Sequence, residues 1–143
     1  MQSQKKTSRM ISQLNSINDF EHFVEDHKDD FVRVSLTDHI QKIIDEKGLS
    51  KAEVIRAADL DRVYGYQILC GRRAPTREKL IQLSFGLKLD LDETQSLLKV
   101  AGLAPLYARI KREAAIIFCK NHRYDLMETQ SFLQKTQVRI IGE

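Results

Sequence analysis

The sequence predicts an all-α fold, and three observations support this prediction. Apolar residues recur at the three- and four-residue spacing of amphipathic helices, whereas no stretch alternates long enough to indicate a strand. Only two prolines and six glycines occur among 143 residues, so few tight turns are available. Ser, Thr or Asp precedes several of the periodic segments at the position of a helix N-cap. The length fits one domain, or one domain with small appendages.

Composition excludes several classes of protein. The apolar share of 42% and charged share of 30% are those of an ordinary globular chain. The longest apolar run, residues 114–119, is far shorter than the ~20 residues of a membrane span. The polar start gives no sign of a secretory signal, and the two cysteines, Cys70 and Cys119, have neither disulfide-framework nor zinc-site spacing. We therefore expect a cytoplasmic protein without a metal site.

Residues 1–34 are expected to form an N-terminal extension that is partly mobile. Residues 1–15 are polar, and Ser16 is placed to cap a short helix. Helical spacing relates the apolar residues that follow, which are Ile17, Phe20, Phe23, Val24 and Phe31.

The next elements are two helices separated by Gly48. The first is expected over residues 37–47, with one face formed by Leu36, Ile40, Ile43 and Ile44. The second should begin at Ser50, because Ser50 and Glu53 have the spacing of a capping box, in which each side chain accepts from the other residue's amide. This helix should stop near Asp59.

Two further helix starts follow at short intervals. Asp61 is expected to cap a helix that runs to about Cys70 and is ended by Gly71. Thr76, just after Pro75, is expected to cap the next helix, whose apolar face contains Leu80, Ile81, Leu83 and Phe85.

The second half of the chain contains an internal repeat with an offset of 35 residues. Residues 77–78 and 90–96 resemble residues 112–113 and 125–131 in the same register. Asp90-x-x-Glu93 and Asp125-x-x-Glu128 are both capping-box patterns, so each copy is interpreted as a helical hairpin. Pro105, in the connection between the copies, suits a helix start. Chance similarity of two amphipathic hairpins is the alternative interpretation.

Residues 49–73 carry the functional signal. Two short helices joined by a three-residue turn, followed by a glycine and a basic loop, have the pattern of a helix-turn-helix. The residues that characterise the segment are Leu49-Ser50, Ala52-Glu53-Val54-Ile55, Ala58, Leu60, Ile68 and Gly71-Arg72-Arg73-x-Pro75. At these positions it resembles the Cro and lambda-repressor family, also called the XRE family, and the resemblance extends over about residues 36–87. It implies a repressor-like domain of about five helices, residues 35–103, followed by a C-terminal helical hairpin, residues 104–143.

Three positions depart from the family pattern. Asp59 replaces the turn glycine, and it tolerates a positive φ better than most residues. Gly65 occupies an apolar core position of the second helix, where glycine costs ~1 kcal/mol of helix propensity against alanine. Lys51 replaces a common glutamine, which favours a phosphate contact at that position.

In such motifs the N-terminal half of the second helix meets base edges in the major groove. Counted from the Asp61 cap, positions 62, 63, 66 and 67 share one face, whereas positions 65 and 68 face the core. The resemblance therefore implies base contacts from Arg62, Val63, Tyr66 and Gln67, which otherwise would be ordinary solvent-facing residues. Phosphate contacts are expected from Lys51, Arg72, Arg73 and Thr76.

The function expected is that of a sequence-specific DNA-binding transcriptional regulator, a repressor or autoregulator associated with the nucleoid. We expect a homodimer on a palindromic operator, with the C-terminal hairpin as the best interface candidate. The apolar residues of that hairpin are Ile116, Ile117, Phe118, Leu126, Phe132 and Leu133; their alternative role is to complete the core. No nucleotide-binding, hydrolase or metal-ligand motif is found, so neither an enzyme nor a cofactor is expected.

A second class of function is an antitoxin-like or adaptor module that binds a toxin- or kinase-like protein. Phe20, Phe23 and the acidic run over residues 25–30 are candidates for such a docking surface. Selection of a palindromic site from random DNA would distinguish the two classes.

Overall fold

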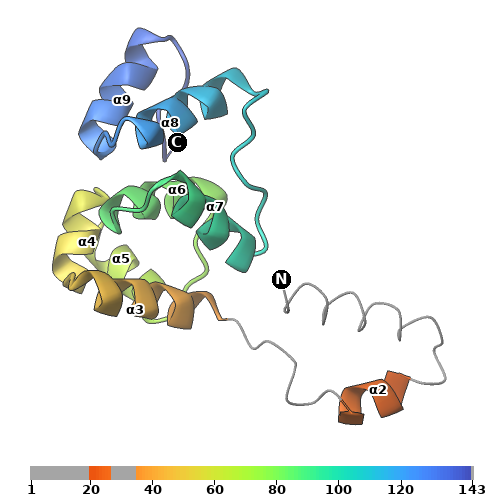
Figure 1. The fold of residues 1–143 in the computed structure, drawn as a ribbon. Coiled ribbons are helices and arrows are strands. Elements are labelled where there is room, and N and C mark those ends of the chain that lie inside the picture. The colour runs from red at the N-terminus through yellow and green to blue at the C-terminus, as the bar shows by residue number, and fades with distance from the viewer. Residues whose placement is uncertain (1–19, 27–34, 143) are drawn as a thin grey trace. The chain divides into compact units, whose positions relative to one another are not determined.

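The computed structural model describes residues 20–26 and 35–142. These residues form eight α-helices and no strand, which confirms the predicted all-α fold (Figure 1). The chain divides into two compact units, Met1–Arg33 and Val34–Glu143.

The first unit contributes one described helix, α2 (Phe20–Asp26). Phe23 is buried, whereas Phe20 and Val24 are exposed. The predicted cap Ser16, the polar stretch of residues 1–15 and the flanking Ile17 and Phe31 lie outside the described residues.

The second unit begins with three helices whose caps follow the sequence closely. Ser35 caps α3, and the helix ends at Gly48, which has a φ of 64°. Ser50 accepts from the Glu53 amide and Asp61 from the Tyr64 amide, so both caps were predicted correctly. The predicted return bond, from the Ser50 amide to the Glu53 carboxylate, is not formed. The three helices are α3 (Leu36–Lys47), α4 (Lys51–Ala57) and α5 (Arg62–Leu69).

The remaining four helices form two hairpins. They are α6 (Arg77–Gly86), α7 (Leu91–Val100), α8 (Lys111–Asn121) and α9 (Leu126–Lys135). The helix start predicted at Pro105 is wrong, because α8 begins only at Lys111. Residues 103–110 form an irregular connection instead, in which the Ala104 and Pro105 carbonyls accept bonds from the Arg77 guanidinium.

The two hairpins repeat each other in detail at an offset of 35 residues. Both capping boxes, at Asp90 and Asp125, are formed as predicted. Each turn contains a residue in the left-handed region, Lys88 in one copy and Arg123 in the other, both with a φ of 56°. The Gln95 side chain exchanges two hydrogen bonds with the backbone of Leu106, and the side chain of Gln130 does the same with Ile141. The repeat is thus a duplicated structural unit.

Reciprocal ion pairs join the two hairpins. Arg77 of the first copy donates to both carboxylate oxygens of Glu113 in the second, at 2.8 and 2.9 Å. Arg112 of the second copy donates to both carboxylate oxygens of Glu78 in the first. In each copy the arginine binds the glutamate of the other copy. Such reciprocal contacts relate the two hairpins by an approximate twofold axis.

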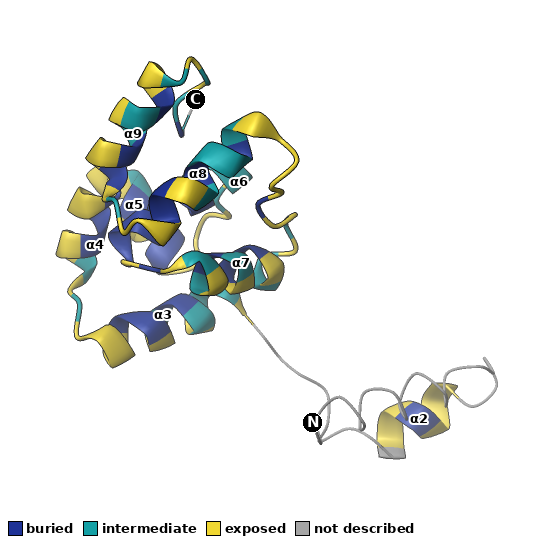
Figure 2. Ribbon diagram, turned by 45° about the horizontal axis from the view of Figure 1, so that its top comes forward, coloured by how far each residue is buried: buried dark blue, intermediate teal, exposed yellow. Residues whose placement is uncertain are grey.

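One hydrophobic core extends through all seven helices of this unit. It includes Ile40 from α3, Val54 from α4, Leu80 from α6 and Leu133 from α9. The buried positions lie on the sides of the helices that face one another (Figure 2). Three of the six apolar residues expected at a dimer interface, Ile116, Leu126 and Leu133, are therefore buried within the chain's own core.

Candidate nucleic-acid interface

The turn between α4 and α5 is closed by local hydrogen bonds. Asp59 adopts a φ of 52°, the left-handed conformation that the sequence predicts for this substitute of the turn glycine. The Asp59 amide donates to the Arg56 carbonyl, and the Leu60 amide donates back to the Ile55 carbonyl at 3.1 Å. These bonds end α4 and direct the chain to the Asp61 cap of α5.

A buried glutamine of α6 holds this turn through hydrogen bonds to its backbone. The Gln82 side chain donates to the carbonyls of Ala58, at 2.6 Å, and Asp59, at 2.9 Å. Gln82 is only 5% exposed, so both bonds lie where water would not replace them. Sequence reasoning missed this residue, because a single glutamine inside an apolar helix gives no signal of its distant partners.

Gly65 allows α5 to lie unusually close to α4. A Cβ at this position would come within 2.8 Å of Ile55 Cγ1 and 2.9 Å of Ile55 Cγ2. Gly65 and Ile68 are both buried, as their spacing predicts. The departure from the family pattern is therefore explained by close packing of the two helices rather than by a weakened core.

The four residues predicted to contact bases lie on the outward side of α5. Arg62, Val63 and Tyr66 are exposed, and Gln67 is half-buried. Arg62 and Tyr66 border a hollow of about 440 Å³ that continues onto α4, where Arg56 also lines it. Sequence reasoning missed Arg56; its position five residues before the Asp61 cap is the only signal that would have indicated it.

In the loop after α5, two consecutive backbone amides donate to one carbonyl, that of Gln67. The amides of Arg72 and Arg73 both donate to the Gln67 carbonyl, at 2.9 and 3.2 Å. Gly71 has a φ of 81°, and a Cβ there would meet the Thr37 hydroxyl at 2.7 Å. The Arg73 guanidinium lies 5.0 Å from the ring centroid of Tyr64, a cation–π distance that orients this side chain. Arg72 is exposed.

The other two predicted phosphate contacts lie at helix starts. Lys51 is the first residue of α4 and is half-buried. Thr76 caps α6, and its hydroxyl oxygen accepts from the Lys79 amide at 3.2 Å. Both residues therefore lie where backbone amides and a helix dipole favour an anion.

Ion pairing separates two groups of basic residues that look alike in the sequence. Arg77, close to Arg72 and Arg73 in the chain, is paired with Glu113. In the part of the chain that the structure describes, Arg56, Arg62 and Arg72 take part in no ion pair. Arg56, Arg62 and Arg72 therefore lie on or next to α5 without an ion-pair partner, whereas Arg77 and Arg112 hold the two hairpins together.

The pKa values of both paired glutamates are lowered from that of an ordinary glutamate. Hydrogen bonds from Arg77 lower the pKa of Glu113, more than burial raises it. Burial is the largest influence on Glu78 and raises its pKa, but the hydrogen bonds from Arg112 and the Gly142 amide together hold the pKa below its ordinary value. Both glutamates are charged at neutral pH and act as structural groups.

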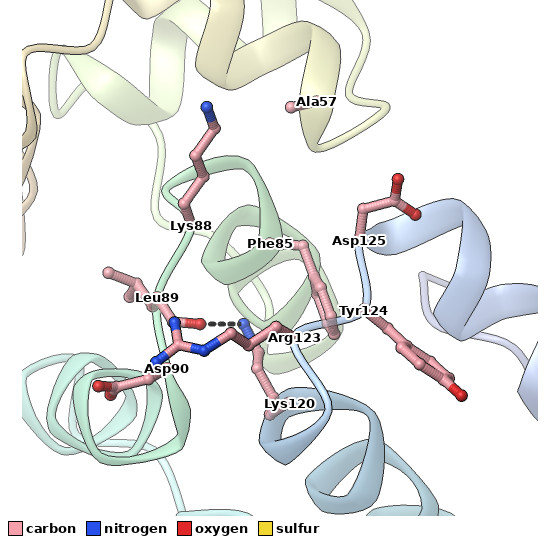
Figure 3. A pocket seen from close by; sticks show the side chains of 9 residues that line it. All are labelled: Ala57, Phe85, Lys88, Leu89, Asp90, Lys120, Arg123, Tyr124 and Asp125. Carbon is pink, nitrogen blue, oxygen red and sulfur yellow. Dashed lines mark hydrogen bonds between the residues drawn. The ribbon is translucent and has the colours of Figure 1, made fainter.

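A second cavity, of about 330 Å³, lies where the two hairpins meet (Figure 3). Its lining includes residues that occupy equivalent positions in the two copies: Lys88 and Arg123 are one such set, and Phe85 and Lys120 are another. The Lys120 ammonium donates to the Leu89 carbonyl at 3.1 Å and lies 3.8 Å from the Phe85 ring centroid. Burial lowers the pKa of Lys120 to about 7. This lysine belongs to the core rather than to a basic surface.

No protein-family model, curated protein or solved structure matches this chain. Among the described residues, no helix is long and apolar enough to cross a membrane, and no group of three or more His, Cys, Asp or Glu side chains could hold a metal ion.

Proposed function

We propose that the protein is a sequence-specific DNA-binding transcriptional regulator that inserts α5 into the major groove. The observation that carries this proposal is the outward face of α5. There Arg62, Val63 and Tyr66 are exposed beside unpaired cations, while Gly65 and Ile68 fix the opposite face against the core. The resemblance of residues 49–73 to the XRE family supports the same assignment.

The roles follow from the chemistry of each side chain. Arg62 can bond guanine through two donors, Gln67 can bond adenine, and Val63 can meet a thymine methyl group. Arg72, Arg73, Lys51 and Thr76 would hold the DNA backbone without reading sequence, and Arg56 joins them from α4. Because one such helix covers few base pairs, the protein would act as a homodimer on a palindromic operator in the cytoplasm.

The test is selection of duplexes from a random pool, followed by binding measurements at one salt concentration. We expect a palindrome to be enriched, and alanine at Arg62 or Gln67 to cost ~1–3 kcal/mol on that site and much less on scrambled DNA. Replacement of Arg72 and Arg73 by alanine should weaken both duplexes and flatten the salt dependence by ~0.9 per lost contact. Lys111→Ala, which removes one exposed charge from α8, serves as the charge-matched control for Arg62→Ala.

Enrichment of no sequence, or an unchanged ratio of cognate to scrambled binding in both alanine variants, would contradict the proposal. The alternative of an antitoxin-like or adaptor module that binds a protein partner would then take its place.

A further inference from the structure

The approximate twofold axis makes it possible to compare the outer faces of the two hairpins position by position. In the first hairpin this face is covered, because α4 packs on α6 and α3 packs on α7. Gly86 marks the closest approach: a Cβ there would overlap the Val54 carbonyl oxygen and lie 2.8 Å from Ala58 Cβ. Leu83, Leu87 and Leu97 of the same face are fully buried.

The equivalent face of the second hairpin carries larger and more exposed side chains. Asn121 stands at the position of Gly86 and is exposed. Phe118, at the position of Leu83, is 39% exposed. We call the aromatic side chains of this face the outer patch; its members are Phe118, His122, Tyr124 and Phe132.

The outer patch is a preassembled cluster of rings. Phe118 stacks on His122 at 3.9 Å between centroids and on Phe132 at 4.9 Å, and Tyr124 meets Phe132 edge-on at 6.4 Å. Rigid aromatic clusters of this kind lose little conformational entropy on association and are typical of the centres of protein interfaces. The second hairpin thus has an aromatic cluster on the face that, in the first hairpin, is covered by α3 and α4.

The charges beside the patch indicate which partner fits. On α9, Glu128 lies four residues before Phe132 and Lys135 three residues after it. At 100° per residue the three side chains fall within about 60° of one another. A second α9 that crosses antiparallel at Phe132 would bring each Glu128 beside the partner's Lys135. The surface is therefore complementary to itself, as a twofold dimer requires.

We propose that the outer patch is the interface through which two copies of this chain form a twofold-symmetric dimer. In this dimer the two α9 helices run antiparallel, with Phe132 near the axis and Glu128 of each copy facing the partner's Lys135. The inference deepens the proposed function, because it names the surface that would join two α5 helices. It is tested without DNA, so that it and the DNA-binding proposal can fail separately.

The first experiment measures self-association of the full chain by sedimentation equilibrium over a range of micromolar concentrations. We expect the wild type to be a dimer and the double variant Phe118→Gln/Phe132→Gln to associate on the order of 100-fold more weakly, since each aromatic contact is lost in both copies. Met127→Gln is the matched control: Met127 is 69% exposed but lies about 140° around α9 from Phe132, so it should leave association unchanged. Thermal melts followed by circular dichroism establish that each variant is folded.

The second experiment tests the antiparallel arrangement by charge exchange. Glu128→Lys alone and Lys135→Glu alone should each weaken the homodimer about tenfold, because each places like charges opposite one another. An equimolar mixture of the two single variants should form a heterodimer, in which both contacts are again attractive. Glu128→Gln, which removes the charge but keeps an acceptor for the capping box, separates charge from helix capping.

Three results would overturn the proposal. They are a monomeric wild type at every concentration, a dimer that the double aromatic variant does not weaken, and a mixture of the charge variants that forms no heterodimer. The first two exclude the outer patch as the interface, and the third excludes the antiparallel pairing of α9.

Discussion

The α6–α7 and α8–α9 hairpins have similar backbones but different surroundings. Both keep the Asp cap, the left-handed turn residue and the glutamine that holds the segment following the hairpin. Among helices α3–α9, α4 packs on α6 and α3 packs on α7, whereas the main contacts of α8 and α9 are with each other and with the first hairpin. The residues that set local backbone geometry are therefore retained between the copies, whereas those on the outer face differ according to what covers it.

Alanine at position 86 and at its equivalent, position 121, should give the largest difference in the free energy of unfolding between the two hairpins. Gly86→Ala would force α4 away from α6, because the added Cβ meets backbone and a short side chain that cannot move aside. We expect a loss of about 3 kcal/mol or more in the free energy of unfolding. Asn121→Ala, in an exposed position, should be neutral or stabilise by ~0.5 kcal/mol through helix propensity.

Urea denaturation of the two variants measures this difference. Equal midpoints would show that the outer faces of the two hairpins are not packed differently. A folded Gly86→Ala variant should also lose specific DNA binding, because the α4–α5 pair rests on α6.

Removing either of the reciprocal ion pairs should give the next largest loss of stability, and the loss should be similar in both copies. Arg77→Met leaves Glu113 without its ion-pair partner, whereas Arg112→Met leaves Glu78 with only the more distant Arg139, at 4.0 Å. All four side chains are at least three-quarters buried, so we expect a loss of about 2–3 kcal/mol for each variant at neutral pH. A much larger loss in one copy would show that the two ion pairs do not contribute equally to stability.

The direction in which the stability loss of Arg77→Met changes with pH follows from the lowered pKa of Glu113. The pKa of Glu113 is lowered in the folded protein, chiefly by the hydrogen bonds from Arg77, so its contribution to stability is present above the pKa of an unfolded glutamate. The contribution disappears as the pH falls through the lowered pKa. Arg77→Met removes the largest cause of this lowering, so the difference in unfolding free energy between variant and wild type should narrow in acid. Denaturation at neutral and acidic pH measures it.

Most of what the sequence predicted correctly depends on contacts within four residues. The caps at Ser50, Asp61 and Thr76 and the boxes at Asp90 and Asp125 belong to this class, because a cap and its amide lie three residues apart. The repeat likewise predicted two equivalent hairpins. The outward placement of Arg62, Val63 and Tyr66 followed from helical periodicity.

What the sequence did not reveal depends on distant contacts. A repeat shows that two segments are alike but not the rotation that relates them, so the pairing of Arg77 with Glu113 was not predictable. The start assigned to Pro105 was wrong for the same reason, since Arg77 holds that connection from 28 residues away. The partner of Gly65, the Ile55 side chain, was equally hidden.

The smallest predicted effect concerns the one buried position at which the two copies differ in charge. Phe85 of the first copy corresponds to Lys120 of the second, which is 5% exposed and has a pKa lowered to about 7, mainly by burial and only partly offset by Asp90 and Glu93. Between this pKa and that of an ordinary lysine the unfolded chain holds a proton that the folded chain has released. Stability of the wild type should therefore rise as the pH is raised from 7 towards 10.

Lys120→Met should remove this dependence, because no amine then has to lose its charge on folding. At neutral pH we expect the variant to be more stable than wild type by about 1–2 kcal/mol, since an apolar side chain of similar length can occupy the space against the Phe85 ring. Lys88→Met, which removes an exposed lysine from the same cavity, should leave the pH profile as it is. Thermal denaturation across this pH range compares the three proteins. A wild-type profile that is flat, or a Lys120→Met variant that is less stable at neutral pH, would show that the bonds of Lys120 to the Leu89 carbonyl and the Phe85 ring outweigh the cost of burying its charge.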